Sequence, residues 1–99
     1  MSTIITDTWM SSTITRHVAE LVKLPSPLTG YSWQVTWLPG RHLDRDQAIT
    51  AMRIAESVDA ALDPAAAGRV WPHIAGWAAE LGLSDVDAIA MASLAPEYY

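Results

Sequence analysis

The clearest structural signal in this chain is the stretch Tyr31-Ser32-Trp33-Gln34-Val35-Thr36-Trp37. Its side chains alternate, so that three aromatic residues and a valine fall on one side and three polar residues on the other. This period of two predicts a β-strand with one apolar face, because successive side chains of a strand point to opposite faces. Large aromatic side chains dominate any core or interface that they join. The face with Tyr31, Trp33 and Trp37 is therefore either core, which we favour, or a surface for a partner.

The predicted strand needs a hydrogen-bonding neighbour, because a lone strand leaves its backbone groups unpaired. Residues 18–24 can supply that neighbour, with the proline- and glycine-containing segment 25–30 as the turn between the two strands. The alternative is an amphipathic helix over residues 13–24, since the apolar residues of that segment also fit helical spacing. We favour a β-hairpin over about residues 18–38 and keep the helix as the alternative.

Helical signals follow the hairpin, and together they predict an α+β fold in which the hairpin packs on three or four short helices. The first helix has the clearest start, because Asp44 and Gln47 have the spacing of a capping box. Pro72 is expected to interrupt the helical run and to hold Trp71 in an extended conformation. Trp71 and Trp77 are expected to build the core. The predicted helices span about residues 45–62, 64–70, 72–81 and 85–94.

Length and composition predict one small domain. The chain has 99 residues, five of them tryptophan, with no phenylalanine and no cysteine. We expect a flexible N-terminal arm over residues 1–12, a globular domain over residues 13–95 and a tail over residues 96–99. The lack of cysteine excludes disulfide frameworks and thiolate metal sites. No apolar run is long enough to span a membrane and no signal peptide is recognisable, so we expect a cytoplasmic protein without a membrane partner.

Negative charge is concentrated in the second half of the chain. Residues 1–50 hold four basic and four acidic residues, whereas residues 51–99 hold two basic and seven acidic residues. An acidic surface repels nucleic acid. It either keeps the protein soluble, which we favour, or binds a basic partner through residues such as Asp85 and Asp87. Ile49 falls in the middle of the polar side of the first predicted helix, so it is a further candidate contact residue.

Residues 71–94 resemble the helix-turn-helix hairpin of bacterial regulators in their packing pattern. Ala78 is the small residue where the helices would cross, and Gly82 is the turn residue. Base readout requires donors such as arginine or asparagine, and phosphate contact requires positive charge. The second helix instead begins with Asp85 and Asp87. We therefore favour a structural helical corner and keep a DNA-binding regulator as the alternative.

Motifs for catalysis or cofactor binding are lacking. The chain has no nucleophile elbow, phosphate-binding glycine loop, dinucleotide fingerprint or metalloprotease helix. His42, Asp44 and Asp46 alternate, and their side chains are of the kinds that bind metals. Asp44 is already assigned as a helix cap, however, and a helix start does not keep strand-like spacing. We expect no catalytic residue, no cofactor and no metal ion, and hence no enzyme.

Three parts of the chain carry a family resemblance. Residues 25–41, which end in Trp37-Leu38-Pro39-Gly40-Arg41, are the first part, and residues 47–52 and 71–83 are the others. Together they resemble small uncharacterised proteins of actinobacteria and of their mobile elements. The resemblance implies a genomic setting, and it carries over no activity, ligand or site residue.

These observations predict a non-enzymatic interaction or regulatory protein that acts through contacts with another protein. The candidate contact residues are Tyr31, Trp33, Trp37, Ile49, Asp85 and Asp87. A two-stranded hairpin has two open edges, and pairing across them predicts a homodimer with a four-stranded sheet. The alternatives are the DNA-binding regulator and a mobile-element protein that inhibits a host defence complex by presenting acidic side chains to a basic groove.

Overall fold

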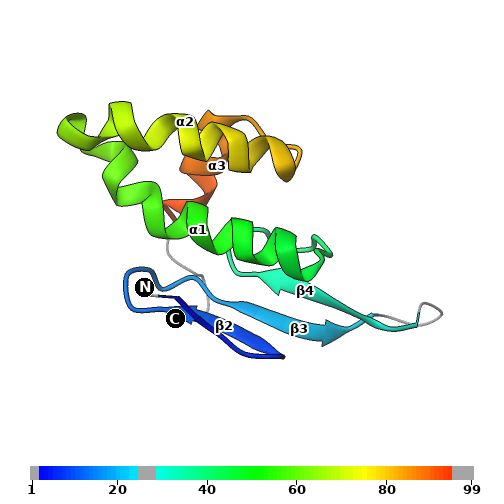
Figure 1. The fold of residues 1–99 in the computed structure, drawn as a ribbon. Coiled ribbons are helices and arrows are strands. Elements are labelled where there is room, and N and C mark those ends of the chain that lie inside the picture. Colours follow the sequence, from blue (N-terminus) through cyan, green and yellow to red (C-terminus); the bar gives the residue numbers. More distant parts are fainter. Residues whose placement is uncertain (1–2, 25–28, 95–99) are drawn as a thin grey trace.

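The computed structural model describes residues 3–24 and 29–94, and it has the predicted α+β fold (Figure 1). Four strands form one antiparallel sheet in the order β1-β2-β3-β4, and the three described helices lie on one side of it. The strands are β1 (Thr3–Ile5), β2 (Trp9–Ser12), β3 (Ala19–Lys23) and β4 (Tyr31–Val35). The helices are α1 (Arg45–Leu62), α2 (Pro64–Glu80) and α3 (Asp85–Ala92).

The predicted hairpin is confirmed by the pairing of β3 with β4. Leu21 lies opposite Trp33 in an antiparallel register, and the Leu24 N–H donates to the Gly30 carbonyl at 3.0 Å just beyond the paired strands. Gly30 has a φ of +99°, a conformation that a residue without a Cβ adopts at little cost. The helix that we kept as the alternative for residues 13–24 is therefore wrong. Residues 25–28 of the expected turn lie outside the described residues.

The expected arm over residues 1–12 is also wrong for the part that the structure describes. Residues 3–12 form the hairpin of β1 and β2, and β2 continues the sheet by pairing Met10 with Ala19 of β3. A hydroxyl group closes the turn, because the Trp9 N–H donates to Thr6 Oγ1 at 3.0 Å while the Thr6 N–H donates to the Trp9 carbonyl at 2.8 Å. The Ser- and Thr-rich composition that suggested an arm thus supplies turn hydrogen bonds instead.

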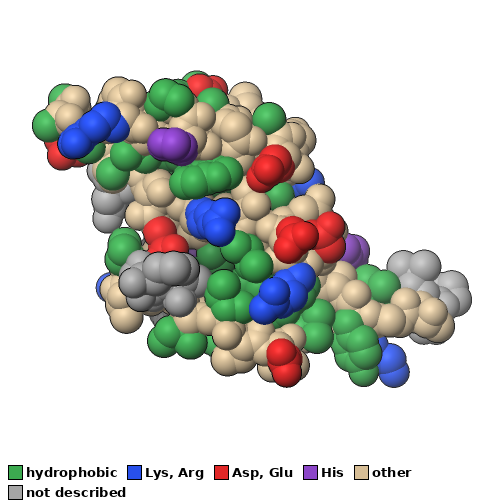
Figure 2. Space-filling view, in the orientation of Figure 1, with side chains coloured by type: hydrophobic (Ala, Val, Ile, Leu, Met, Phe, Trp, Pro, Cys, Tyr) green, Lys and Arg blue, Asp and Glu red, His purple; other side chains and the backbone are tan. Residues whose placement is uncertain are grey.

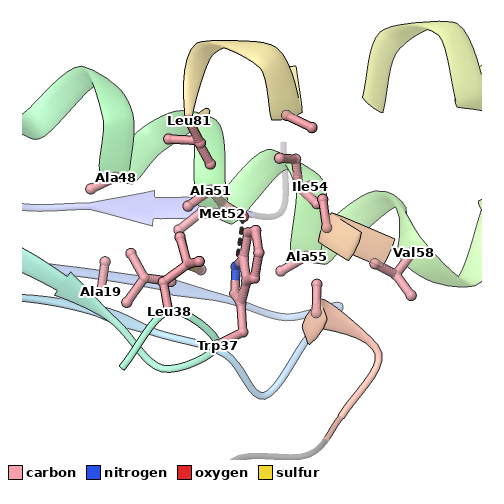
Figure 3. Packing of buried hydrophobic residues seen from close by; sticks show 14 of the residues in the cluster. Ala19, Trp37, Leu38, Ala48, Ala51, Met52, Ile54, Ala55, Val58 and Leu81 are labelled. Carbon is pink, nitrogen blue, oxygen red and sulfur yellow. Dashed lines mark hydrogen bonds between the residues drawn. The ribbon is translucent and has the colours of Figure 1, made fainter. Parts of the chain in front are cut away.

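The core lies between the sheet and α1, and it continues to buried residues of α2 and α3 such as Ile74 and Ile89 (Figure 3). Met10, Ala19, Trp33 and Val35 project from one face of three neighbouring strands and are buried. The alanines that α1 contributes to this core have short side chains, which allow helix and sheet to pack closely. The buried residues of α1 are Ala48, Ala51, Met52, Ile54, Ala55, Val58 and Ala61 together with Thr50.

α1 has the predicted bounds and the predicted cap. The Gln47 N–H donates to Asp44 Oδ1 at 2.8 Å, and the Asp44 N–H donates to Gln47 Oε1 at 3.0 Å. The capping box therefore satisfies two of the backbone donors that a helix start leaves free. α1 lies between the sheet and α2, so it is covered on two sides (Figure 1). None of the three described helices is both long enough and apolar enough to cross a bilayer.

α2 is one continuous helix, and the predicted break at Pro72 is wrong. Asp63 caps it with Pro64 in the first turn, and the Ala65 N–H donates to Asp63 Oδ1 at 3.1 Å. Pro72 cannot donate to the carbonyl of Gly68. Both residues are exposed, so water can replace the missing donor, and Trp71 remains helical instead of extended. α3 ends at Ala92, slightly earlier than predicted.

Replacing Pro72 with alanine should stabilise the protein by about 1–3 kcal/mol, because the substitution restores a helical hydrogen bond and removes the ring clash. The free energy of unfolding from urea denaturation measures the gain. Pro64→Ala is the matched control: proline costs nothing in the first turn, so this variant should not be stabilised. Equal stabilities of the two variants would contradict the account given for Pro72.

Candidate interaction surfaces

Two of the predicted contact residues belong to the core. Trp33 is 4% exposed and Trp37 is 3% exposed, although Trp37 lies beyond the end of β4. The Trp37 indole N–H donates to the carbonyl of Ala51 in α1 at 3.1 Å, which fixes the ring against the helix (Figure 3). The sequence left open whether this face belongs to the core or to a surface for a partner. Trp33 and Trp37 belong to the core.

Tyr31 points to the same face of the sheet as Trp33, but it is exposed. It is 68% exposed and lies opposite Lys23, where the β3–β4 hairpin extends past the helices (Figure 1). Alternation along a strand assigns residues to a face, but a helix must lie over that face to bury them. Tyr31 is thus the one exposed member of the predicted aromatic face.

Ile49 is half-buried against the core instead of lying exposed among polar residues. The expectation of an exposed side chain assumed a helix with one covered face, whereas α1 packs against both the sheet and α2. The neighbouring Thr50 shows the same effect, because it is buried and its hydroxyl donates to Glu80 Oε2 of α2 at 3.3 Å. Ile49 therefore serves packing between the layers.

Asp85 and Asp87 lie in the first turn of α3, where acidic side chains favour the positive end of the helix dipole. Asp85 accepts a hydrogen bond from the Trp71 indole N–H, which links α3 to α2. This bond, with a smaller contribution from the Val86 N–H, lowers the pKa of the Asp85 carboxyl. The Asp87 N–H donates to Ser84 Oγ at 3.1 Å, so Ser84 caps the start of α3. Asp85 thus joins two helices, and only the Asp87 side chain is exposed.

The corner between α2 and α3 has the predicted turn residue. Gly82 has a φ of +74°, and the Leu83 N–H donates to the carbonyl of the buried Ala78 at 2.9 Å. Trp71 and Trp77, expected in the core, are half-buried and pack at its margin. Trp77 also stacks on His73, with ring centroids 5.9 Å apart.

His17 is a buried polar residue whose role the sequence did not indicate. It is 3% exposed, and its ring lies between the Thr36 hydroxyl, 2.7 Å from Nδ1, and the Ala92 carbonyl, 2.8 Å from Nε2. A carbonyl only accepts, so Nε2 carries the proton and donates to it. In a neutral ring Nδ1 then carries no proton, so the Thr36 hydroxyl donates to Nδ1 while its oxygen accepts from the Val18 N–H. Burial is the main reason that the pKa of His17 is lowered. A neutral His17 thus joins the sheet to the end of α3.

The face of the sheet opposite the helices is the second feature that sequence reasoning missed. The strand register places Ile4, Trp9, Glu20 and Val22 on it, because their neighbours along each strand face α1. Ile4 is 55% exposed and Trp9 is 39% exposed. A signal for the first hairpin was present in the sequence. Residues 4–5 and 9–10 are apolar pairs on either side of turn-forming residues, a pattern that predicts two short strands. We call this surface the helix-free face.

The helix-free face is hollowed in two places. One hollow of about 280 Å³ lies over β3 and β4, and its lining includes Val22, Gln34 and Pro39. Its neighbour, of about 620 Å³, is lined by residues that include Trp9 and Arg16. Val18 lines both hollows, so they are adjacent. The face therefore combines an exposed indole with a concave surface beside it that both apolar and polar side chains line.

The edges of the sheet differ from those assumed for the predicted dimer. The free edge that we assigned to β3 is covered by β2, and the sheet of one chain already has four strands. On the outer edge of β4, Trp33 and Leu43 exchange backbone hydrogen bonds of 2.8 and 3.0 Å. The β3–β4 hairpin therefore does not have the two open edges on which the predicted dimer was based. Pairing across those edges no longer supports a dimer.

Two of the three residues considered as metal ligands, His42 and Asp44, have other partners. His42 Nδ1 lies 2.8 Å from Ser32 Oγ, and Asp44 caps α1. Within residues 3–24 and 29–94 there is no group of three or more histidine, cysteine or acidic residues placed to hold a metal ion. Comparison of the chain with family models, with curated proteins and with solved structures gives no match.

Proposed function

We propose that this protein is a non-enzymatic interaction module that acts by protein–protein contact through the helix-free face of its sheet. The observation that carries the proposal is the exposed apolar surface on that face, formed by Ile4, Trp9 and the margin of the hollow at Val22. The solvated face of an antiparallel sheet is ordinarily polar. An apolar group there is a cost to a monomer and a source of affinity when a partner covers it.

Trp9 is the centre of the proposed contact. Tryptophan is enriched among the residues that dominate binding energy, because it buries a large area with few rotatable bonds. Trp9 is held in place by its backbone, which pairs with Glu20 of β3 and hydrogen-bonds to Thr6 in the turn. An aromatic side chain on a rigid strand loses little conformational freedom on binding.

Replacing Trp9 with alanine should abolish capture of the partner by the immobilised protein from an extract of the source organism. The captured protein is identified by mass spectrometry, and its affinity is then measured with purified components. We expect the variant to bind at least about tenfold more weakly than the wild type. A thermal melt of the variant verifies that it remains folded.

Tyr31→Ala is the matched control, because Tyr31 is more exposed than Trp9 but lies on the other face of the sheet. It should retain the partner. Equal binding by the wild type and both variants would refute the assignment of the contact to the helix-free face.

A further inference from the structure

The helix-free face carries both parts of a self-complementary contact. Trp9 projects from β2, and the smaller hollow lies beside it over the next two strands, β3 and β4. In a two-fold dimer the same patch serves both copies, so a projection and a hollow on one face can fill each other reciprocally. A hollow of about 280 Å³ is close to the lower end of the range for small-ligand pockets, roughly 300 Å³. That size suits a single aromatic side chain.

The distribution of charge favours contact between two copies through their sheets over contact through their helices. Residues 1–36, the part of the chain that contains all four described strands, hold two acidic and two basic residues and have no net charge. Residues 37–99 contain four basic and nine acidic residues, so they carry the entire net charge of −5. Most acidic side chains on the face seen in Figure 2 accordingly lie at the level of the helices. Two copies that meet by their sheets keep these acidic layers farthest apart, and contact through the helices would bring them together.

We propose that the partner of the helix-free face is a second copy of this chain, with Trp9 of each copy seated in the hollow over β3 and β4 of the other. This inference rests on the proposed function and names its partner. The sheets stack face to face, and the strand edges take no part.

Sedimentation velocity over a range of concentrations tests the dimer. The wild type should change from monomer to dimer as its concentration rises to about 100 μM, the range of weak but specific association. Trp9→Ala should raise the dissociation constant by about tenfold or more, and Tyr31→Ala should leave it unchanged. A monomeric wild type, or a dimer that Trp9→Ala does not weaken, would overturn the inference.

Cross-linking gives a second readout, because the chain has no cysteine of its own. A cysteine introduced as Glu20→Cys on the helix-free face should be joined to its copy by a short bismaleimide. Asp87→Cys on α3 removes the same charge from an exposed site in the helical layer, and it should not be joined. The reverse pattern would place the interface on the helices and overturn the inference.

The two proposals fail in distinguishable ways. A monomer that captures a different protein through Trp9 would leave the proposed function standing and remove the self-association. A chain that neither dimerises nor captures a protein through Trp9 would remove both.

Discussion

Replacing Trp37 with alanine should lower the free energy of unfolding by about 3–5 kcal/mol, the largest effect of any single truncation in the core. The Trp37 side chain follows β4 and is almost fully buried. Its indole N–H donates to the Ala51 carbonyl of α1. The truncation leaves a cavity and removes that hydrogen bond. Because small domains are stable by only about 5–15 kcal/mol, a large fraction of the variant should unfold in mild denaturant.

Urea denaturation followed by circular dichroism measures the loss. Trp37→Phe keeps most of the volume and removes the hydrogen bond, so it should cost about 1–2 kcal/mol. Tyr31→Ala removes an exposed aromatic side chain and should change stability by less than about 0.5 kcal/mol. A Trp37→Ala variant as stable as Tyr31→Ala would show that the indole does not hold α1 to the sheet.

Acidification below about pH 6.5 should destabilise the protein through His17, whose unperturbed pKa is 6.5. Burial lowers the pKa of His17 in the folded chain, and the hydrogen bonds to the Ala92 and Leu94 carbonyls oppose that change less strongly. The unfolded chain therefore binds a proton at a higher pH than the folded chain does. The stability from a neutral His17 is complete above pH 6.5, and it is lost as the pH falls from there to the lowered pKa.

His17→Gln should flatten this pH dependence, because glutamine does not titrate and can still donate to the Ala92 carbonyl. His17→Ala leaves that carbonyl and the Thr36 hydroxyl without a partner, so it should cost about 1–3 kcal/mol at pH 7.5. The free energy of unfolding between pH 5 and pH 8 is the measurement. If the free energy of unfolding of His17→Gln depends on pH as strongly as that of the wild type, the acid sensitivity belongs to other groups.

Local signals predicted the elements that depend on a few neighbouring residues. Asp44 and Gln47 predicted the start of α1, Gly82 predicted the turn before α3, and the alternation around Trp33 predicted β4. In each case the side chains that decide the backbone conformation lie within a few residues of it. Short-range chemistry of this kind is present in the sequence itself.

The errors arose where a distant part of the chain supplies the deciding contact. Residues 3–12 are strands because β3 offers an edge to pair with, and α2 passes through Pro72 while its other residues pack on α1 and α3. Of the predicted contact residues, Trp33, Trp37 and Ile49 pack in or against the core, and Asp85 bonds to Trp71. The helix-free face was missed because its residues come from four strands that lie apart in the sequence.

The sequence alone determined the class of the fold, the bounds of α1 and the strand around Trp33, because periodicity and capping are local. It left a helix open for residues 13–24, so the pairing of β3 with β4 was decided by the tertiary structure. Only the tertiary structure decided which face of the sheet the helices cover. That choice buries Trp33 and Trp37, leaves Tyr31 and Trp9 exposed, and joins His17 to Ala92 across 75 positions of the chain. Burial depends on what lies opposite a side chain in space, and a residue's immediate neighbours do not specify it.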